Sequence, residues 1–169
     1  MNSYPEEAAI LAMTDKAHFM DCFVGDVVNN NQTAMEVWLS MVKETPSWFD
    51  FLMSLRNKIT RRLGLKDLGA FGDIIPSKQA VDYLDGDRIG IFTVFMNEAR
   101  EIILEDKDKH LNVRLSLYLV PNGDVQKVYV TTVVHVNNAL GKAYMFFVGP
   151  THKLIVPAML ARLSRSQQH

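Results

Sequence analysis

Hydrophobic and polar residues alternate along residues 110–136, and this period of two predicts two long strands of an antiparallel sheet. On one face lie Leu111, Val113, Leu115, Leu117 and Leu119, followed by Val128, Val130, Thr132, Val134 and Val136. The opposite face carries polar residues such as Arg114 and His135. Residues 121–124 read Pro-Asn-Gly-Asp, a strong signal for a hairpin turn. The pattern therefore predicts a sheet with one apolar side and one wet side.

Further strands are expected on both sides of this hairpin. Residues 18–28 predict a first strand, and residues 89–97 and 101–106 predict a second hairpin. Residues 143–148 are apolar at every position except Tyr144, which is typical of a strand covered on both faces.

Three helices are predicted. Thr33 and Glu36 form a capping box that starts the first, and Thr45-Pro46 starts the second. The apolar stripe of the second helix comprises Trp48, Leu52, Leu55, Ile59 and Leu63, and Gly64 ends it. A final helix is expected over 151–165, with Pro157 producing a kink or a late start. Residues 66–88 are punctuated by glycine and proline; they fit a covering loop or a short helix at 78–83.

The order of elements is strand, two helices, five or six strands, helix. An antiparallel sheet of six or seven strands must cover its apolar face, and the final helix is the expected cover. The sequence thus predicts the α+β helix-grip fold, with the helix pair closing one end. One domain is expected over 1–169, with 1–15 as an N-terminal extension.

Composition narrows the function classes. A net charge of −1 argues against a protein built to neutralise nucleic-acid phosphates. Cys22 is the only cysteine, so a reducing compartment is expected. The chain begins without a basic, strongly apolar leader, and no apolar run is long enough to span a membrane. We therefore expect a cytoplasmic protein that binds no nucleic acid and needs no cofactor.

Three strings carry a family resemblance: WFDFLMSLRNKITRRLGL, DKDKHLNVRLSLYL and TTVVHVNNALGKAYMFFVGPTHKLIV. Together they resemble the DUF2867 family, which has no assigned function, over about residues 18–162. The resemblance implies a START-like or Bet v 1-like domain, in which a sheet grips a long helix around a cavity for apolar ligands. It implies no catalytic residues. Some members of the family are joined to dehydrogenase-like domains, but this chain lacks their glycine-rich nucleotide motif.

Arg56 is the first candidate for a binding residue. It follows Leu55 of the apolar stripe, so an inward side chain would need a partner. It can bind an anionic group of a ligand as a bidentate fork. The alternatives are an ion pair with Asp106 or Asp108 and a solvated position.

The histidines are the next candidates. At the start of the final helix, His152 would be kept neutral by the helix dipole and can act as a base or a hydrogen-bond partner of a ligand. Its alternative role is to tie the helix start to the sheet. His110 follows two acids, and an acid from 98–108 can serve either histidine. Because no HxH or HxxxH spacing occurs, no metal site is predicted.

Glu98, Glu101 and Glu105 are interpreted as solvated edge charges rather than acid–base groups. Cys22 has no base beside it in the sequence, so a nucleophilic role would need a spatial histidine.

Aromatic and methionine residues are expected in the core, with some lining a cavity. The candidate ligand-binding residues are Arg56, Trp48, Leu52, Phe92, His110, Thr132, Tyr144, His152 and Met159. We favour the binding of a small apolar or amphipathic molecule between the sheet and the final helix. The alternatives are an enzyme of the cyclase, dehydratase or hydrolase kind, and an interaction module or homodimer without a ligand.

Overall fold

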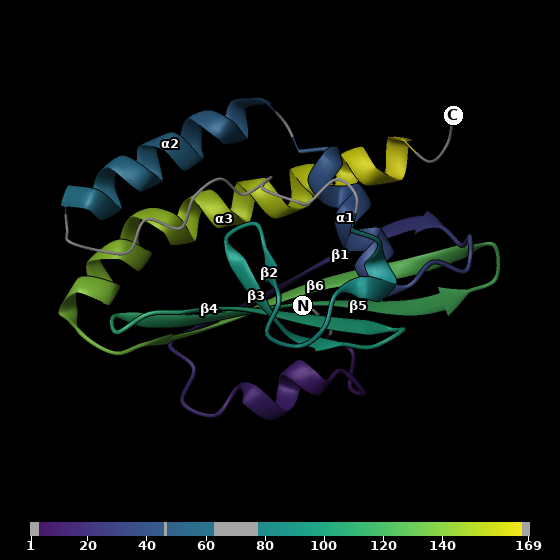
Figure 1. Ribbon diagram of the computed structural model, residues 1–169, viewed down its shortest axis with the longest axis horizontal. Helices are drawn as coiled ribbons and strands as arrows, with labels where there is room; N and C mark the ends of the chain where they lie inside the picture. The colour runs from purple at the N-terminus through teal and green to yellow at the C-terminus, as the bar shows by residue number, and fades with distance from the viewer. Residues whose placement is uncertain (1–3, 46, 63–77, 167–169) are drawn as a thin grey trace.

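A six-stranded antiparallel sheet carries the fold in a computed structural model (Figure 1). The structure describes residues 4–45, 47–62 and 78–166; within 47–62 it leaves out the side chains of Ser47, Leu52, Leu55, Arg56 and residues 59–62. The strands are β1 (Phe19–Val28), β2 (Arg88–Ile89), β3 (Phe92–Asn97), β4 (Glu101–Lys107), β5 (Leu111–Asn122) and β6 (Val125–Val136). Their order is β1-β6-β5-β4-β3-β2, so the first strand pairs with the last.

Three α-helices lie on one side of this sheet (Figure 1). They are α1 (Ala34–Lys43), α2 (Ser47–Arg62) and α3 (Ala139–Ser166), and two short 3-10 helices are η1 (Ala9–Met13) and η2 (Ala80–Asp82). The long α3 runs across the sheet, and α1 packs against both α3 and the sheet. This arrangement confirms the predicted α+β helix-grip fold, with six strands.

The predicted capping box starts α1. Glu36 N–H donates to Thr33 Oγ1 over 3.3 Å, and Thr33 N–H donates to Glu36 Oε2 over 2.7 Å. The helix then buries Val37, Trp38 and Met41 against the sheet, as its apolar spacing predicts.

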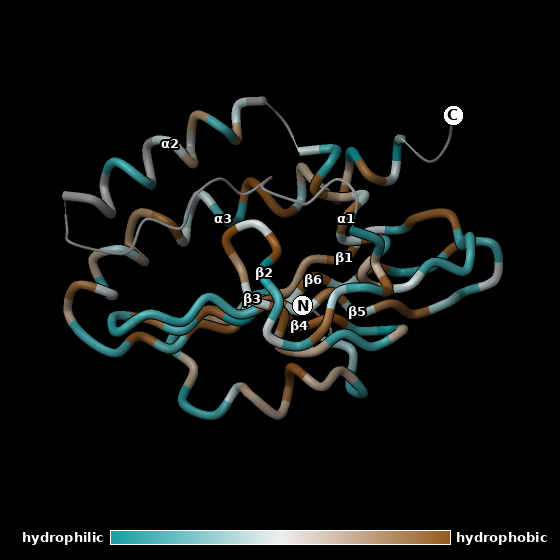
Figure 2. Tube along the Cα trace, in the orientation of Figure 1, coloured by the Kyte–Doolittle hydropathy of each residue, from teal (hydrophilic) through white to brown (hydrophobic). Residues whose placement is uncertain are grey.

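The main core lies between the inner face of the sheet and the helices. It combines alternate residues of β5 and β6 with one face of α3, and Figure 2 shows hydrophobic residues concentrated along these elements. Members from the two strands and α3 are Leu115, Leu117, Leu119, Val128, Val130, Val156, Met159, Leu160 and Leu163. The predicted alternation is therefore confirmed for the inner face.

The outer face is less exposed to water than the sequence suggests. Residues 4–17 lie across it (Figure 1), and Ile10 packs with Ile103, Tyr118 and Val133 in a second core. Glu101, predicted to be a solvated edge charge, is only 4% exposed. Its carboxylate accepts hydrogen bonds from Ala9 N–H, Ile10 N–H and Ser116 Oγ–H, over 2.7, 3.3 and 2.6 Å.

The strand predicted at 143–148 is wrong, because these residues belong to α3. Asn138 caps the helix by accepting a hydrogen bond from Gly141 N–H over 3.1 Å. Tyr144 is then buried, while Phe146 and Phe147 are 76% and 61% exposed. A run that is apolar at nearly every position satisfies both periods, so the sequence pattern alone does not separate a strand from a helix here. The final helix thus begins at Ala139 rather than 151, and it contains Pro150 as well as Pro157.

The strand predicted at 89–97 is divided in two. Gly90 adopts a φ of 57°, which reverses the chain and pairs Ile89 with Phe92. The rest of the predicted hairpin is confirmed, since β3 pairs with β4.

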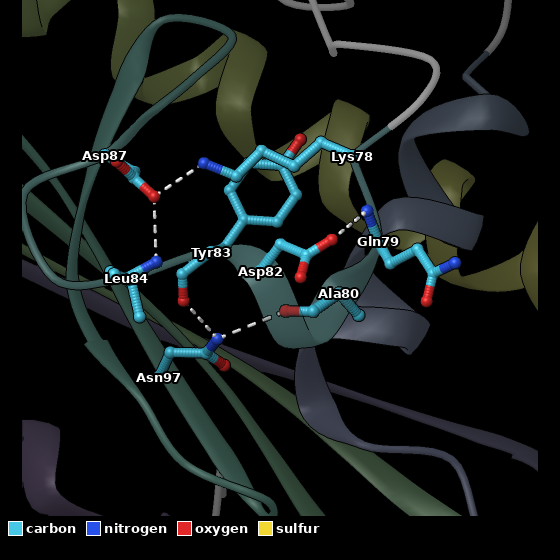
Figure 3. Close-up of polar contacts among 8 residues, drawn as sticks. All are labelled: Lys78, Gln79, Ala80, Asp82, Tyr83, Leu84, Asp87 and Asn97. Atoms are coloured by element: carbon cyan, nitrogen blue, oxygen red, sulfur yellow. Dashed lines mark hydrogen bonds and ion pairs between the residues drawn. The ribbon is translucent and has the colours of Figure 1, made fainter.

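Residues 78–87 contain the predicted short helix as η2, and polar contacts fix its position (Figure 3). Asn97 Nδ2 donates to the carbonyl oxygens of Tyr83 and Ala80, over 2.8 and 3.4 Å. Lys78 Nζ forms an ion pair with Asp87 Oδ2 over 2.6 Å. Gly64 and the earlier part of the predicted loop lie outside the described residues.

The stripe predicted for α2 is corrected at its start. Trp48 is 44% exposed, and the next residue, Phe49, is buried instead.

Candidate ligand cavity and its histidine

A cavity of about 380 Å³ lies between the inner face of the sheet and α3. Most of its wall is apolar, contributed by strands, by α1 and α2, and by one face of α3. The wall includes Phe19, Trp38, Met41, Phe49, Met53, Ile91, Phe92, Val113, Leu115, Val130, Val134, Met145, Phe147, Val148, Ile155, Val156 and Met159. The polar side chains of the wall are those of Asp106, Thr132, Tyr144, Thr151 and His152.

The imidazole of His152 is held at both of its nitrogen atoms. Its Nδ1 lies 3.1 Å from Asp21 Oδ2, and its Nε2 lies 3.3 Å from Thr132 Oγ1. Asp21 and Thr132 are directly opposite one another on β1 and β6, so the register of the sheet brings both side chains to the same ring.

The chemistry of the two partners selects one form of the imidazole. A carboxylate can only accept a hydrogen bond, so Nδ1 carries the proton that faces Asp21. In the neutral ring, Nε2 then has a lone pair that accepts the hydroxyl proton of Thr132. The arrangement thus presents a basic nitrogen and a hydroxyl oxygen at the cavity wall.

Asp21 lies behind this ring on β1. It is 6% exposed, and its Oδ1 has no hydrogen-bond partner in the described part of the chain. The rings of Phe19 and Phe23 flank His152, with centroid distances of 6.5 and 6.3 Å. A buried carboxylate with one oxygen unsatisfied is costly, which sets this group apart from an ordinary structural acid.

The structure brings five of the predicted site residues to one cavity wall, namely Phe92, Thr132, Tyr144, His152 and Met159. Their role in binding stays a prediction. The position predicted for His152 is wrong, since it lies near the middle of α3 and not at a helix start. The dipole argument therefore does not apply to it, and its orientation comes from Asp21 and Thr132.

The other predicted residues are not shown at this wall. The exposed Trp48 lies outside it. His110 directly precedes β5, and its Nδ1 lies 2.9 Å from Asn138 Nδ2 at the start of α3. This contact joins the start of the strand to the start of the helix, which is a structural role. The side chains of Leu52 and Arg56 lie outside the described part of the chain.

Sequence reasoning missed Asp21. The sequence feature that could have identified Asp21 is a carboxylate on the same strand face as Phe19 and Phe23, where the alternation predicts an apolar residue. The acid was expected from residues 98–108. Asp106 of this range lines the cavity, but the carboxylate that contacts His152 is Asp21, and Glu105 forms an ion pair with Arg114 over 2.9 Å.

Cys22 lies on the outer face, where Thr131 Oγ1 donates to its Sγ over 3.3 Å. Burial raises the pKa of this thiol, which opposes formation of the nucleophilic thiolate.

The described residues contain no group of three or more His, Cys, Asp or Glu side chains placed to hold a metal ion. Within the same ranges, no helix is both long and apolar enough to cross a membrane.

The topology and the cavity define a helix-grip domain. The chain belongs to the DUF2867 family, described as a protein of unknown function, whose model matches residues 13–159. No curated protein matches the chain.

Two solved structures are similar in backbone arrangement. A conserved protein from Geobacillus kaustophilus is 11% identical with a TM-score of 0.42, over 89% of this chain and 95% of that one. Norcoclaurine synthase from Thalictrum flavum, in complex with dopamine and hydroxybenzaldehyde, is 14% identical with a TM-score of 0.42, over 98% of this chain and 95% of that one. No ligand or reaction of this chain follows from these likenesses.

Proposed function

We propose that this protein binds a small apolar or amphipathic molecule in the cavity between the sheet and α3. The observation that carries the proposal is the cavity itself, whose volume is about 380 Å³ and whose wall is largely apolar. Concave, mostly apolar sites with a few placed polar groups are the usual form of small-molecule sites.

The volume sets the size of the ligand. An apolar cavity of about 150 Å³ holds benzene, so a cavity of about 380 Å³ fits a molecule of about 15 non-hydrogen atoms. Burying the apolar surface of such a molecule supplies the driving force for binding.

The polar part of the wall sets the ligand's chemistry. Thr132 and His152 offer hydrogen-bonding atoms on a wall that is largely apolar. A ligand with an apolar body and one hydrogen-bonding group satisfies both parts of the wall.

Binding is tested by titrating N-phenyl-1-naphthylamine, an uncharged dye that fluoresces in apolar sites. Ile155→Trp fills the cavity, while Leu154→Trp adds the same ring at a neighbouring position that is 70% exposed. We expect wild type and Leu154→Trp to bind equally, and Ile155→Trp to bind at least about tenfold more weakly. Equal binding by all three, or none by wild type, would contradict the proposal.

An enzymatic function is the second candidate, and the contact between His152 and Asp21 favours it. Its acid differs from the one that the sequence predicts, because it comes from β1 rather than from residues 98–108.

A further inference from the structure

We propose that Thr132, His152 and Asp21 form a nucleophilic relay that hydrolyses uncharged carboxylic esters bound in the cavity. This inference rests on the proposed binding function, because the same cavity must hold the apolar part of the ester. It adds to that function a nucleophile, a base and a class of substrate.

The geometry assigns one role to each side chain. In the nucleophile–base–acid arrangement, a histidine contacts a hydroxyl group through Nε2 and a carboxylate through Nδ1. This arrangement is recognised by its geometry rather than by the fold that carries it. Here the two distances are 3.3 and 3.1 Å. Thr132 and His152 both line the cavity, whereas Asp21 lies behind the ring and serves as a positioning residue.

A purely structural clamp accounts less well for these residues. Apolar side chains of similar size would hold α3 to the sheet without the cost of burying a carboxylate. Asp21 is nevertheless buried, with Oδ1 unsatisfied in the described part of the chain. The cost is understandable if the carboxylate orients His152 and stabilises the imidazolium that forms during reaction.

The first half of the reaction forms an acyl-enzyme. Thr132 Oγ1 attacks the carbonyl carbon of the ester while its proton passes to His152 Nε2. The tetrahedral intermediate collapses, the bond to the alcohol oxygen breaks, and the imidazolium gives its proton to that oxygen. An alcohol leaves, and the acyl group remains on Thr132.

The second half restores the enzyme with one water molecule. His152 Nε2 takes a proton from the water, whose oxygen attacks the acyl carbon. The bond to Thr132 Oγ1 then breaks and that oxygen recovers its proton. In sum, one ester and one water give one acid and one alcohol, with no oxidant or reductant.

The wall indicates which esters fit. A largely apolar surface and a volume of about 380 Å³ suit an acyl chain or aryl group of moderate length. The ester should be uncharged, because a largely apolar wall does not replace the hydration of an anionic group.

The test measures hydrolysis of p-nitrophenyl esters of increasing acyl length by the purified protein. Thr132→Val removes the hydroxyl at constant shape, and Thr131→Val makes the same change on the outer face beside Cys22. We expect Thr132→Val and His152→Gln to lower kcat/KM by about 10³-fold or more, and Thr131→Val to retain it. Thr132→Ser, which keeps the hydroxyl, should remain active, and Asp21→Asn should lower kcat by about 10²-fold or more at unchanged KM.

A fluorophosphonate probe reports the nucleophile directly. Intact mass and peptide mapping should show one adduct on Thr132 in wild type, one at the same position in the Thr132→Ser variant, and none in Thr132→Val. An adduct elsewhere, or hydrolysis that survives Thr132→Val, would overturn the relay.

Failure of the relay is distinguishable from failure of the binding function. If the dye binds and Ile155→Trp weakens it, but no ester is hydrolysed and Thr132 is not labelled, the relay is wrong and the binding function stands. If the dye does not bind either, both are wrong.

Discussion

The two faces of the sheet each bury one carboxylate, and the two carboxylates are used differently. On the outer face, Glu101 accepts three hydrogen bonds and lies beside the second core, beneath residues 4–17. On the inner face, Asp21 contacts His152 through one oxygen, while the other has no partner in the described part of the chain. A cavity of about 380 Å³ lies in front of that histidine.

This comparison separates a structural acid from a candidate functional one. Burial alone does not, because Glu101 and Asp21 are 4% and 6% exposed. The distinguishing features are hydrogen-bond saturation and the presence of an adjoining cavity.

Glu101→Ala should cause the largest loss of stability. It leaves the amides of Ala9 and Ile10 and the hydroxyl of Ser116 without their acceptor inside a core. We expect the free energy of unfolding to fall by about 3 kcal/mol or more, measured by urea denaturation. Glu98→Ala, at an exposed position, is the control and should change it by less than about 0.5 kcal/mol. If the two changes lowered the free energy of unfolding equally, the structural role of Glu101 would be contradicted.

Asp21→Asn should have a much smaller effect on stability. The amide retains a hydrogen-bonding atom near His152 and removes a buried charge, so the free energy of unfolding should stay within about 1 kcal/mol of wild type or rise. A loss of more than about 2 kcal/mol in the same urea experiment would make Asp21 a structural acid like Glu101.

Alkaline pH should destabilise the protein, in part through the outer face. Burial raises the pKa of Cys22 above 9.0, and burial followed by the nearby Glu7 raises the pKa of Tyr118 above 10.0. The folded state then holds these protons more tightly than the unfolded state, so stability is full below pH 9.0 and declines as the pH rises through the raised values. Thermal unfolding across this range should show the decline, and Tyr118→Phe should reduce it. A midpoint independent of pH would contradict this account.

The smallest effect should come from the ion pair between Lys78 and Asp87, which lies outside both cores and is lost at acid pH (Figure 3). Hydrogen bonds from Lys78 and from the amide of Leu84 lower the pKa of Asp87 below 3.8. The stability from this pairing is present above pH 3.8 and is lost as the pH falls through the lowered value. Lys78→Met should weaken the dependence of the thermal midpoint on acid pH. An unchanged acid profile in that variant would show that the pair contributes nothing.

The fold could be predicted where the local patterns agreed with one another. Alternation placed the inner residues of β5 and β6, and the capping box placed α1, because each pattern admits one structure. The pattern failed at 143–148, where uniform hydrophobicity fits a strand and a helix equally. There, the Asn138 cap was the informative residue.

The candidate site could be predicted only in part, because it depends on the register in which the strands pair. The sequence suggested Thr132 and His152 separately, but bringing Asp21 to the same ring requires β1 to pair with β6 so that Asp21 lies opposite Thr132. Such long-range pairing is not encoded in any local spacing. The burial of Glu101 was missed for the same reason, because residues 4–17 cover it from far along the chain.

The imidazole of His152 gives the most direct test that the inner face is the functional one. Nitrogen NMR of the five histidines, with and without N-phenyl-1-naphthylamine, reports which ring nitrogen is protonated and which ring senses the ligand. We predict that His152 carries its proton on Nδ1 and that its Nε2 signal shifts on binding, while His110 stays unchanged. A bound dye that leaves His152 unaffected, or that shifts His110 instead, would contradict the account.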